Sequence, residues 1–115
     1  MKEITWEEIV KRDDIVGGEL ETQEDGEIFR GKISRIILKS DFVIIESEWV
    51  AKLDRNTAEW KLCQNQPFPI NADLIKPSDM GDGRICFTIP LLGFGVIFPK
   101  GTSTLDPAKV KGLED

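Results

Sequence analysis

The stretch EIFRGKISRIILKSDFVIIESEWVAKLDRNTAEWKL, Glu27–Leu62, decides the fold class of this chain. Apolar and polar residues alternate along much of it, as in strands whose successive side chains point to opposite faces of a sheet. Two polar segments, 40–41 and 54–57, interrupt the alternation and are typical of hairpin turns. The stretch therefore predicts a three-stranded antiparallel meander.

The first turn sets a register for the first hairpin. With Lys39 opposite Phe42, four apolar residues share one inner face, namely Ile36, Leu38, Val43 and Ile45. Earlier in the strand the apolar positions are odd-numbered, up to Ile33, so the pattern changes parity before Ile36. One extra residue at Ser34–Arg35 reconciles the two halves, because a β-bulge sets two residues against one. We therefore expect a bulge at that position.

The second turn extends the same inner face. Continuing the register places Ala51 opposite Trp60 and Trp49 opposite Leu62. Trp49 and Trp60 are thus expected to be buried neighbours in the core. In the mouth of a barrel, two such rings would also line a ligand pocket, which makes them candidate ligand-binding residues.

Helical signals stand at both ends of the chain. Thr5 followed by Glu8 forms a capping box, and this predicts a short helix over about residues 6–12. The segment of about residues 102–115 is expected to be a polar tail. Within it, Asp106 can cap a single helical turn that begins at Pro107.

Six strand-like segments separated by turn residues predict a mostly β protein in a single domain, 1–115. A bulge in a long strand favours a barrel, since it lets a sheet turn a corner. We therefore expect a small six-stranded antiparallel barrel, SH3-like or similar, with the short N-terminal helix. A sandwich is the alternative.

Composition limits the classes of function. The net charge is −6, and an acidic chain repels the phosphate backbone, so nucleic-acid binding is not expected. No apolar run approaches the roughly 18 residues of a membrane-spanning helix, and no signal-like segment follows Met1. A cytoplasmic protein without membrane contact is the expectation.

The chain has no histidine and only two cysteines, Cys63 and Cys86. This removes the common zinc sites and the histidine-based catalytic triads. Glu46 and Glu48 share one strand face, but cations are expected beside both. We therefore predict no catalytic residue, no metal site and no cofactor, and hence a protein that is not an enzyme.

An apolar cluster on the otherwise charged outer face is the main functional signal. The register places Ile37 opposite Ile44 there, with Phe42 next to the turn. Such a cluster needs either a cover from this chain or a partner. The leading hypothesis is a small acidic interaction module that contacts another protein, or a second copy as a homodimer, through these three residues. The alternatives are a small-ligand-binding barrel and an acidic nucleic-acid mimic that blocks a DNA-binding protein.

Overall fold

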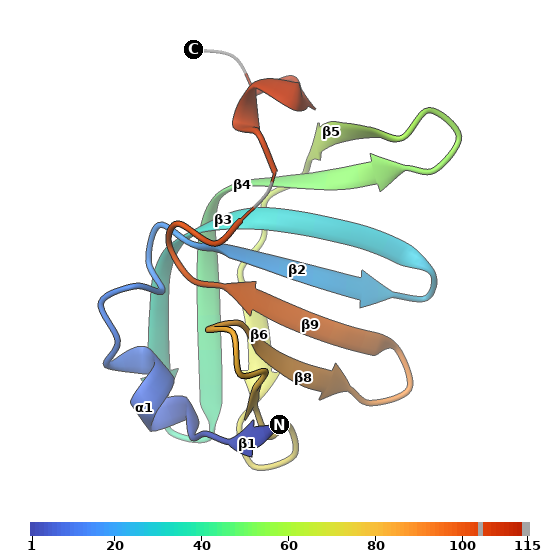
Figure 1. Cartoon of the computed structure of the whole chain (residues 1–115). Coiled ribbons are helices and arrows are strands. Elements are labelled where there is room, and N and C mark those ends of the chain that lie inside the picture. The colour runs from blue at the N-terminus through green and yellow to red at the C-terminus, as the bar shows by residue number, and fades with distance from the viewer. Residues whose placement is uncertain (104, 114–115) are drawn as a thin grey trace.

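The computed structural model describes residues 1–103 and 105–113, and strands make up most of them (Figure 1). The elements in chain order are β1 (Lys2–Glu3), α1 (Trp6–Val10), β2 (Glu19–Glu24), β3 (Glu27–Lys39), β4 (Phe42–Asp54), β5 (Glu59–Cys63), β6 (Phe68–Asn71), β7 (Ser78–Asp79), β8 (Ile85–Ile89), β9 (Gly93–Phe98), the 3₁₀ turn η1 (Pro107–Lys109) and β10 (Val110–Lys111). None of the described helices is long and apolar enough to cross a membrane.

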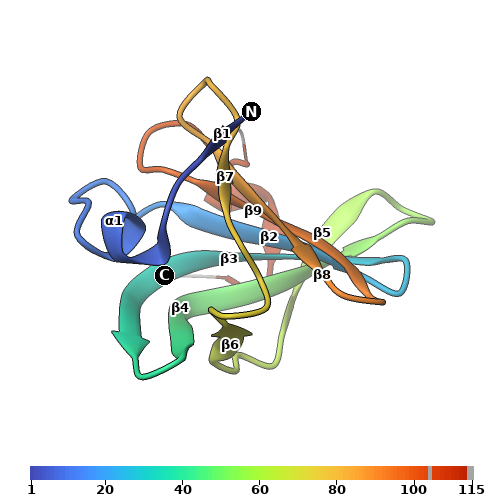
Figure 2. The same cartoon turned by 90° about the horizontal axis from the view of Figure 1, so that it is seen from below.

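The strands form one sheet that does not close. Their order is β1-β7-β8-β9-β2-β3-β4-β5-β10, and β6 pairs with the first half of β4. The expected mostly β class is confirmed, but the six-stranded barrel is wrong, because the described residues form ten strands and the ends of the sheet do not meet. In Figure 2, β6 lies beside β4 and apart from β8.

Proline explains why the free side of β6 accepts no further strand. The N–H of Ala72 donates to Asp41 O on the β4 side. Backbone groups alternate along a strand, so those of Pro69 face the free side. Proline has no N–H to donate to a neighbouring strand, and this blocks a continuing ladder at that edge.

The first hairpin has the register expected from its turn. Ile36 pairs with Ile45, Ile37 with Ile44, and a register shift falls between Ile33 and Arg35. The bulge at Ser34 is therefore confirmed. β3 and β4 curve strongly along their length, so that their turn end lies near α1 (Figure 1).

A second irregularity, which the sequence did not reveal, lies on β4 at Glu48. Lys32 pairs with Trp49 and Ile33 with Ser47, so Glu48 is skipped. The pairing expected between β3 and the rest of β4 is wrong by one residue, and the pairing expected between β4 and β5 is wrong by two, since Ala51 pairs with Leu62 and Leu53 with Trp60. Trp49 consequently lies on the outer face instead of the inner one, because a shift of one residue exchanges the faces of a strand.

The main core lies on the inner face of the curved sheet, and α1 closes one end of it. The indole of Trp6 packs edge-on against Phe87, with ring centroids 5.5 Å apart, and its Nε1–H donates to Ile75 O at 2.7 Å. The capping box between Thr5 and Glu8 is present. The helix ends at Val10, two residues before its expected end.

The C-terminal segment packs on the outer face of the sheet. Leu105, Val110 and Leu113 pack in a second, smaller cluster with the two tryptophans of β4 and β5. The expectation of a polar tail is therefore wrong for residues 105–113, while the Asp106 cap is confirmed by its bond from Ala108 N at 3.0 Å. Residues 104 and 114–115 of the expected tail lie outside the described residues.

Candidate functional site

Three apolar residues form a row across the outer face of the first hairpin and β6. Ile37 of β3 pairs with Ile44 of β4, and Ile44 pairs with Pro69 of β6. Cross-strand partners lie on the same face of a sheet, so the three side chains are lateral neighbours. The two isoleucines are half-buried and Pro69 is exposed. We call this set the outer apolar row.

Neither α1 nor β6 covers the outer apolar row. The buried residues of α1, Trp6 and Ile9, belong to the inner core. β6 lies beside β4 in the sheet and adds Pro69 to the row instead of lying across it. Phe42, two residues closer to the turn than Ile44, is 46% exposed. The three residues expected to contact a partner are therefore close together and accessible.

Charged side chains border the row on both sides. On one side, Arg35 lies 3.8 Å from Glu46 in an exposed ion pair. On the other side, Lys39 pairs across the strands with Phe42. An apolar strip between polar borders resembles a small protein interface, whose centre is depleted of charge and whose rim is polar.

A separate apolar groove of about 460 Å³ opens on the inner face of the sheet. Its lining comes from β2, β3, β4, β6 with the segment before it, and the β8–β9 hairpin. The apolar side chains that line it are Leu20, Phe29, Val50, Pro67, Phe68, Pro69, Ile89 and Leu92. Sequence reasoning missed this groove, since its lining residues are brought together only by the pairing of distant strands.

The β8–β9 turn forms one rim of the groove. Leu91 adopts a left-handed backbone conformation with φ of 66°, and its side chain is fully exposed. That conformation costs a residue with a Cβ roughly 1–2 kcal/mol. The turn is held to the neighbouring one, because Asp25 N donates to Leu92 O at 3.0 Å.

The two candidate ligand-binding tryptophans lie away from this groove. Both are on the outer face, where Trp49 is 7% exposed and Trp60 is half-buried. Val110 packs against them from the C-terminal segment. Trp60 also lines an open pocket of about 880 Å³ between β5 and that segment, and Trp49 does not. Both rings belong to one apolar cluster, but they are not neighbours across the strands as expected, because Trp60 pairs with Leu53. The C-terminal segment, not a barrel interior, surrounds them.

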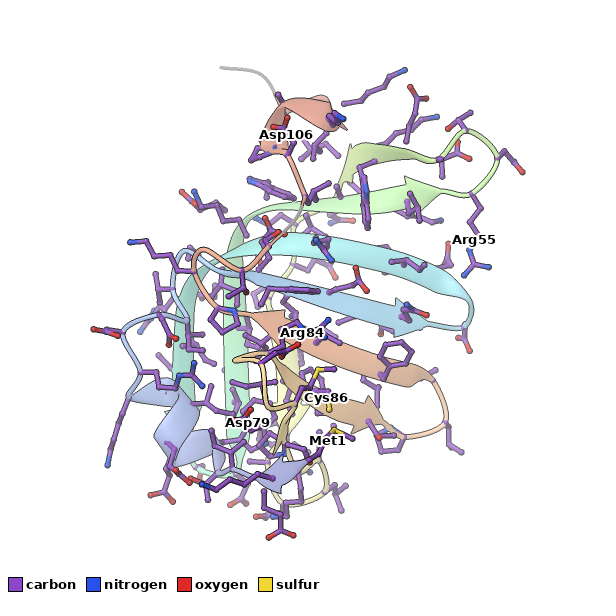
Figure 3. The ribbon with its side chains drawn as sticks, viewed as in Figure 1. Met1, Arg55, Asp79, Arg84, Cys86 and Asp106 are labelled. Carbon is purple, nitrogen blue, oxygen red and sulfur yellow. The ribbon has the colours of Figure 1, made fainter. Side chains whose placement is uncertain are left out.

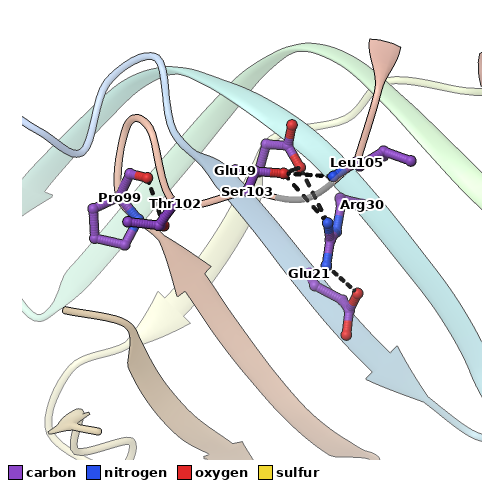
Figure 4. Close-up of polar contacts among 7 residues, drawn as sticks. All are labelled: Glu19, Glu21, Arg30, Pro99, Thr102, Ser103 and Leu105. Carbon is purple, nitrogen blue, oxygen red and sulfur yellow. Dashed lines mark hydrogen bonds and ion pairs between the residues drawn. The ribbon is translucent and has the colours of Figure 1, made fainter. Parts of the chain in front are cut away.

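A buried ionic cluster, drawn in Figure 4, centres on Arg30, whose guanidinium carbon lies 5.9 Å from the Trp60 ring centroid. The Arg30 guanidinium lies 2.7 Å from a Glu21 oxygen and 3.4 Å from a Glu19 oxygen. It also stacks over the Phe98 ring, 4.3 Å from the centroid. The Ser103 hydroxyl donates to Glu19 at 2.6 Å, which ties the C-terminal segment to the sheet.

The two cysteines are free thiols, far apart in sequence and on different strands. Cys63 is half-buried on β5, and this burial raises the pKa of its thiol, which disfavours the reactive thiolate. Cys86 on β8 lies beside Met1, with 3.4 Å between the two sulfur atoms (Figure 3). Within residues 1–103 and 105–113, no three Cys, Asp or Glu side chains gather as metal ligands.

The two glutamates of β4 lie beside cations, as expected. Arg35 lies near Glu46, and Lys32 lies 3.4 Å from Glu48.

No family model, curated protein or solved structure matches this chain.

Proposed function

We propose that this protein is a non-enzymatic interaction module whose contact surface is the outer apolar row together with Phe42. The observation that carries the proposal is the row itself. It joins apolar side chains of three adjacent strands, and neither α1 nor β6 covers it. Exposed apolar surface of this kind, bordered by polar residues, marks interaction sites on small proteins.

A second copy of the chain is the first partner to test. The outer apolar row is apolar along its whole length, so the row of one copy can pack against the row of a second copy about a two-fold axis. In such a contact Ile44, the middle residue of the row, would lie near the axis. The same surface can receive a different protein, which would then compete with the homodimer.

Sedimentation velocity at several protein concentrations tests the proposal. The expected result is a dimer that dissociates on dilution, and Ile44→Glu should remain monomeric because a buried unpaired charge is costly. Val16→Glu is the matched control, since Val16 is 47% exposed and lies outside the row. A monomer at all concentrations that also recovers no specific protein from cell extract would contradict the proposal.

An acidic nucleic-acid mimic has less support. Such a mimic needs carboxylates in an unbroken series at phosphate-like spacing. Here Lys52 is paired with Glu27, and Lys61 lies 3.1 Å from Asp54, so bases interrupt the acids along these strands. A cation nearby reduces the negative potential that a DNA-binding protein would recognise.

A further inference from the structure

Among the described residues that line the groove on the inner face, one is charged, Glu24. Leu20, Thr22 and Glu24 alternate along β2 and all line the groove. The hydroxyl of Thr22 donates to the Glu24 carboxylate at 3.2 Å, which directs that carboxylate along the inner face. The described lining contains no lysine or arginine.

Glu24 has no ion-pair partner among the described residues, although it is half-buried. Arg30 is close in sequence, but its guanidinium lies on the opposite face with Glu19 and Glu21. A carboxylate that is partly removed from water and unpaired is unfavourable, and a cation beside it offsets that cost. The carboxylate of Glu24 is therefore available to a ligand.

The rest of the lining is suited to contact the apolar part of a ligand. Phe29 and Phe68 contribute rings, and Val50, Ile89 and Leu92 contribute aliphatic surface. The volume of about 460 Å³ falls within the roughly 300–1,000 Å³ typical of small-molecule sites. Polar side chains of Ser47, Gln64 and Gln66 complete the lining without adding charge.

We propose that the groove binds a small apolar molecule that carries a cationic amine, with the amine paired to Glu24 and the apolar part against Phe29, Phe68 and Val50. Charge complementarity favours a cationic ligand, because the charged side chain of the described lining, Glu24, is an anion. The groove shares Pro69 with the outer apolar row but opens on the other face of the sheet, so it can be occupied whether or not the protein dimerises.

Decylammonium and decanoate are suitable probes, since each contains ten carbon atoms and their head groups carry opposite charges. Titration of each into the full chain at pH 7, followed by amide NMR shifts, should show saturable binding of decylammonium about tenfold tighter than that of decanoate. The shifted amides should include those of Leu20, Thr22, Phe29 and Leu92. Neutral decanol should bind with intermediate affinity.

Glu24→Gln should bring the affinities for the two charged probes to within about twofold of each other. Asp13→Asn is the matched control, because it removes the same charge at an exposed position outside the groove. It should retain the preference for decylammonium. Equal affinities in the unmodified protein, no saturable binding, or shifts confined to the outer apolar row would each overturn the proposal. The same titration on the Ile44→Glu variant separates this result from any effect of dimer formation.

Discussion

Ser103 donates a 2.6 Å hydrogen bond to the buried carboxylate of Glu19, and this contact joins the C-terminal segment to the second strand of the sheet. Glu19 is 6% exposed and also faces Arg30, which is 7% exposed. Charges this deeply buried are tolerated only when they are paired and hydrogen-bonded. The bond from Ser103 is therefore part of what allows Glu19 to be buried under the segment.

Arg30→Met should lower the free energy of unfolding by about 3–5 kcal/mol, because it leaves two carboxylates near each other without their cation. Urea unfolding monitored by tryptophan fluorescence measures the change. Adding Glu19→Met to this variant should recover part of the loss, since the remaining Glu21 is less buried. A loss under about 1 kcal/mol from Arg30→Met would mean that the cluster is solvated.

Trp49→Ala should cost about 3–5 kcal/mol, the range for a large buried ring. Trp60→Ala should cost less, because Trp60 is only half-buried and borders an open pocket. The same urea unfolding experiment compares the two variants. If Trp60→Ala proves the more costly, the C-terminal segment does not cover Trp49 in solution as described.

Deleting Ser34 should leave a protein that still folds cooperatively, because without the extra residue Ile33 and Ile36 lie two positions apart and a regular strand directs both to the inner face. Ser34→Ala is the control. Ser34 is exposed, so this change should stay within about 0.5 kcal/mol of the unmodified protein. Circular dichroism and thermal unfolding measure both variants, and a deletion variant that no longer unfolds cooperatively would show that the bend made by the bulge is indispensable.

Asp14→Asn should destabilise the protein at pH 7 by at most about 1 kcal/mol, since the ion pair with Arg12 is partly exposed. The hydrogen bond from Arg12, 2.7 Å long, lowers the pKa of Asp14 below its usual value of about 3.9. The stabilisation is therefore fully present above that value and is lost as the pH falls through the lower pKa of the folded state.

The difference between Asp14→Asn and the unmodified protein should consequently shrink as the pH falls below about 3.9, and thermal unfolding at a series of pH values measures it. Asp13→Asn serves as the control. A difference that stays constant at acid pH would mean that the Asp14→Asn substitution disturbs packing and that the lost charge is not the cause.

The sequence by itself determined the local features of this protein. The turn at Ser40–Asp41 fixed the register of the first hairpin, and the change of parity between Ile33 and Ile36 located the bulge at Ser34. The capping box of Thr5 located the start of α1. Each of these depends on residues a few positions apart or on the strict alternation of a strand, so the order of residue types contains enough information.

Only the tertiary structure decided the environment of Trp49 and the position of the groove. The bulge at Glu48 moves Trp49 to the outer face, and Val110, which packs there, comes from the far end of the chain. Once a second register shift is allowed, the apolar alternation of β4 is compatible with Trp49 on either face of the sheet. The pattern alone also does not say which distant segment will cover Trp49. The groove likewise depends on the tertiary structure, because its lining comes from β2, β3, β4, β6 and the β8–β9 hairpin, which lie far apart in the sequence.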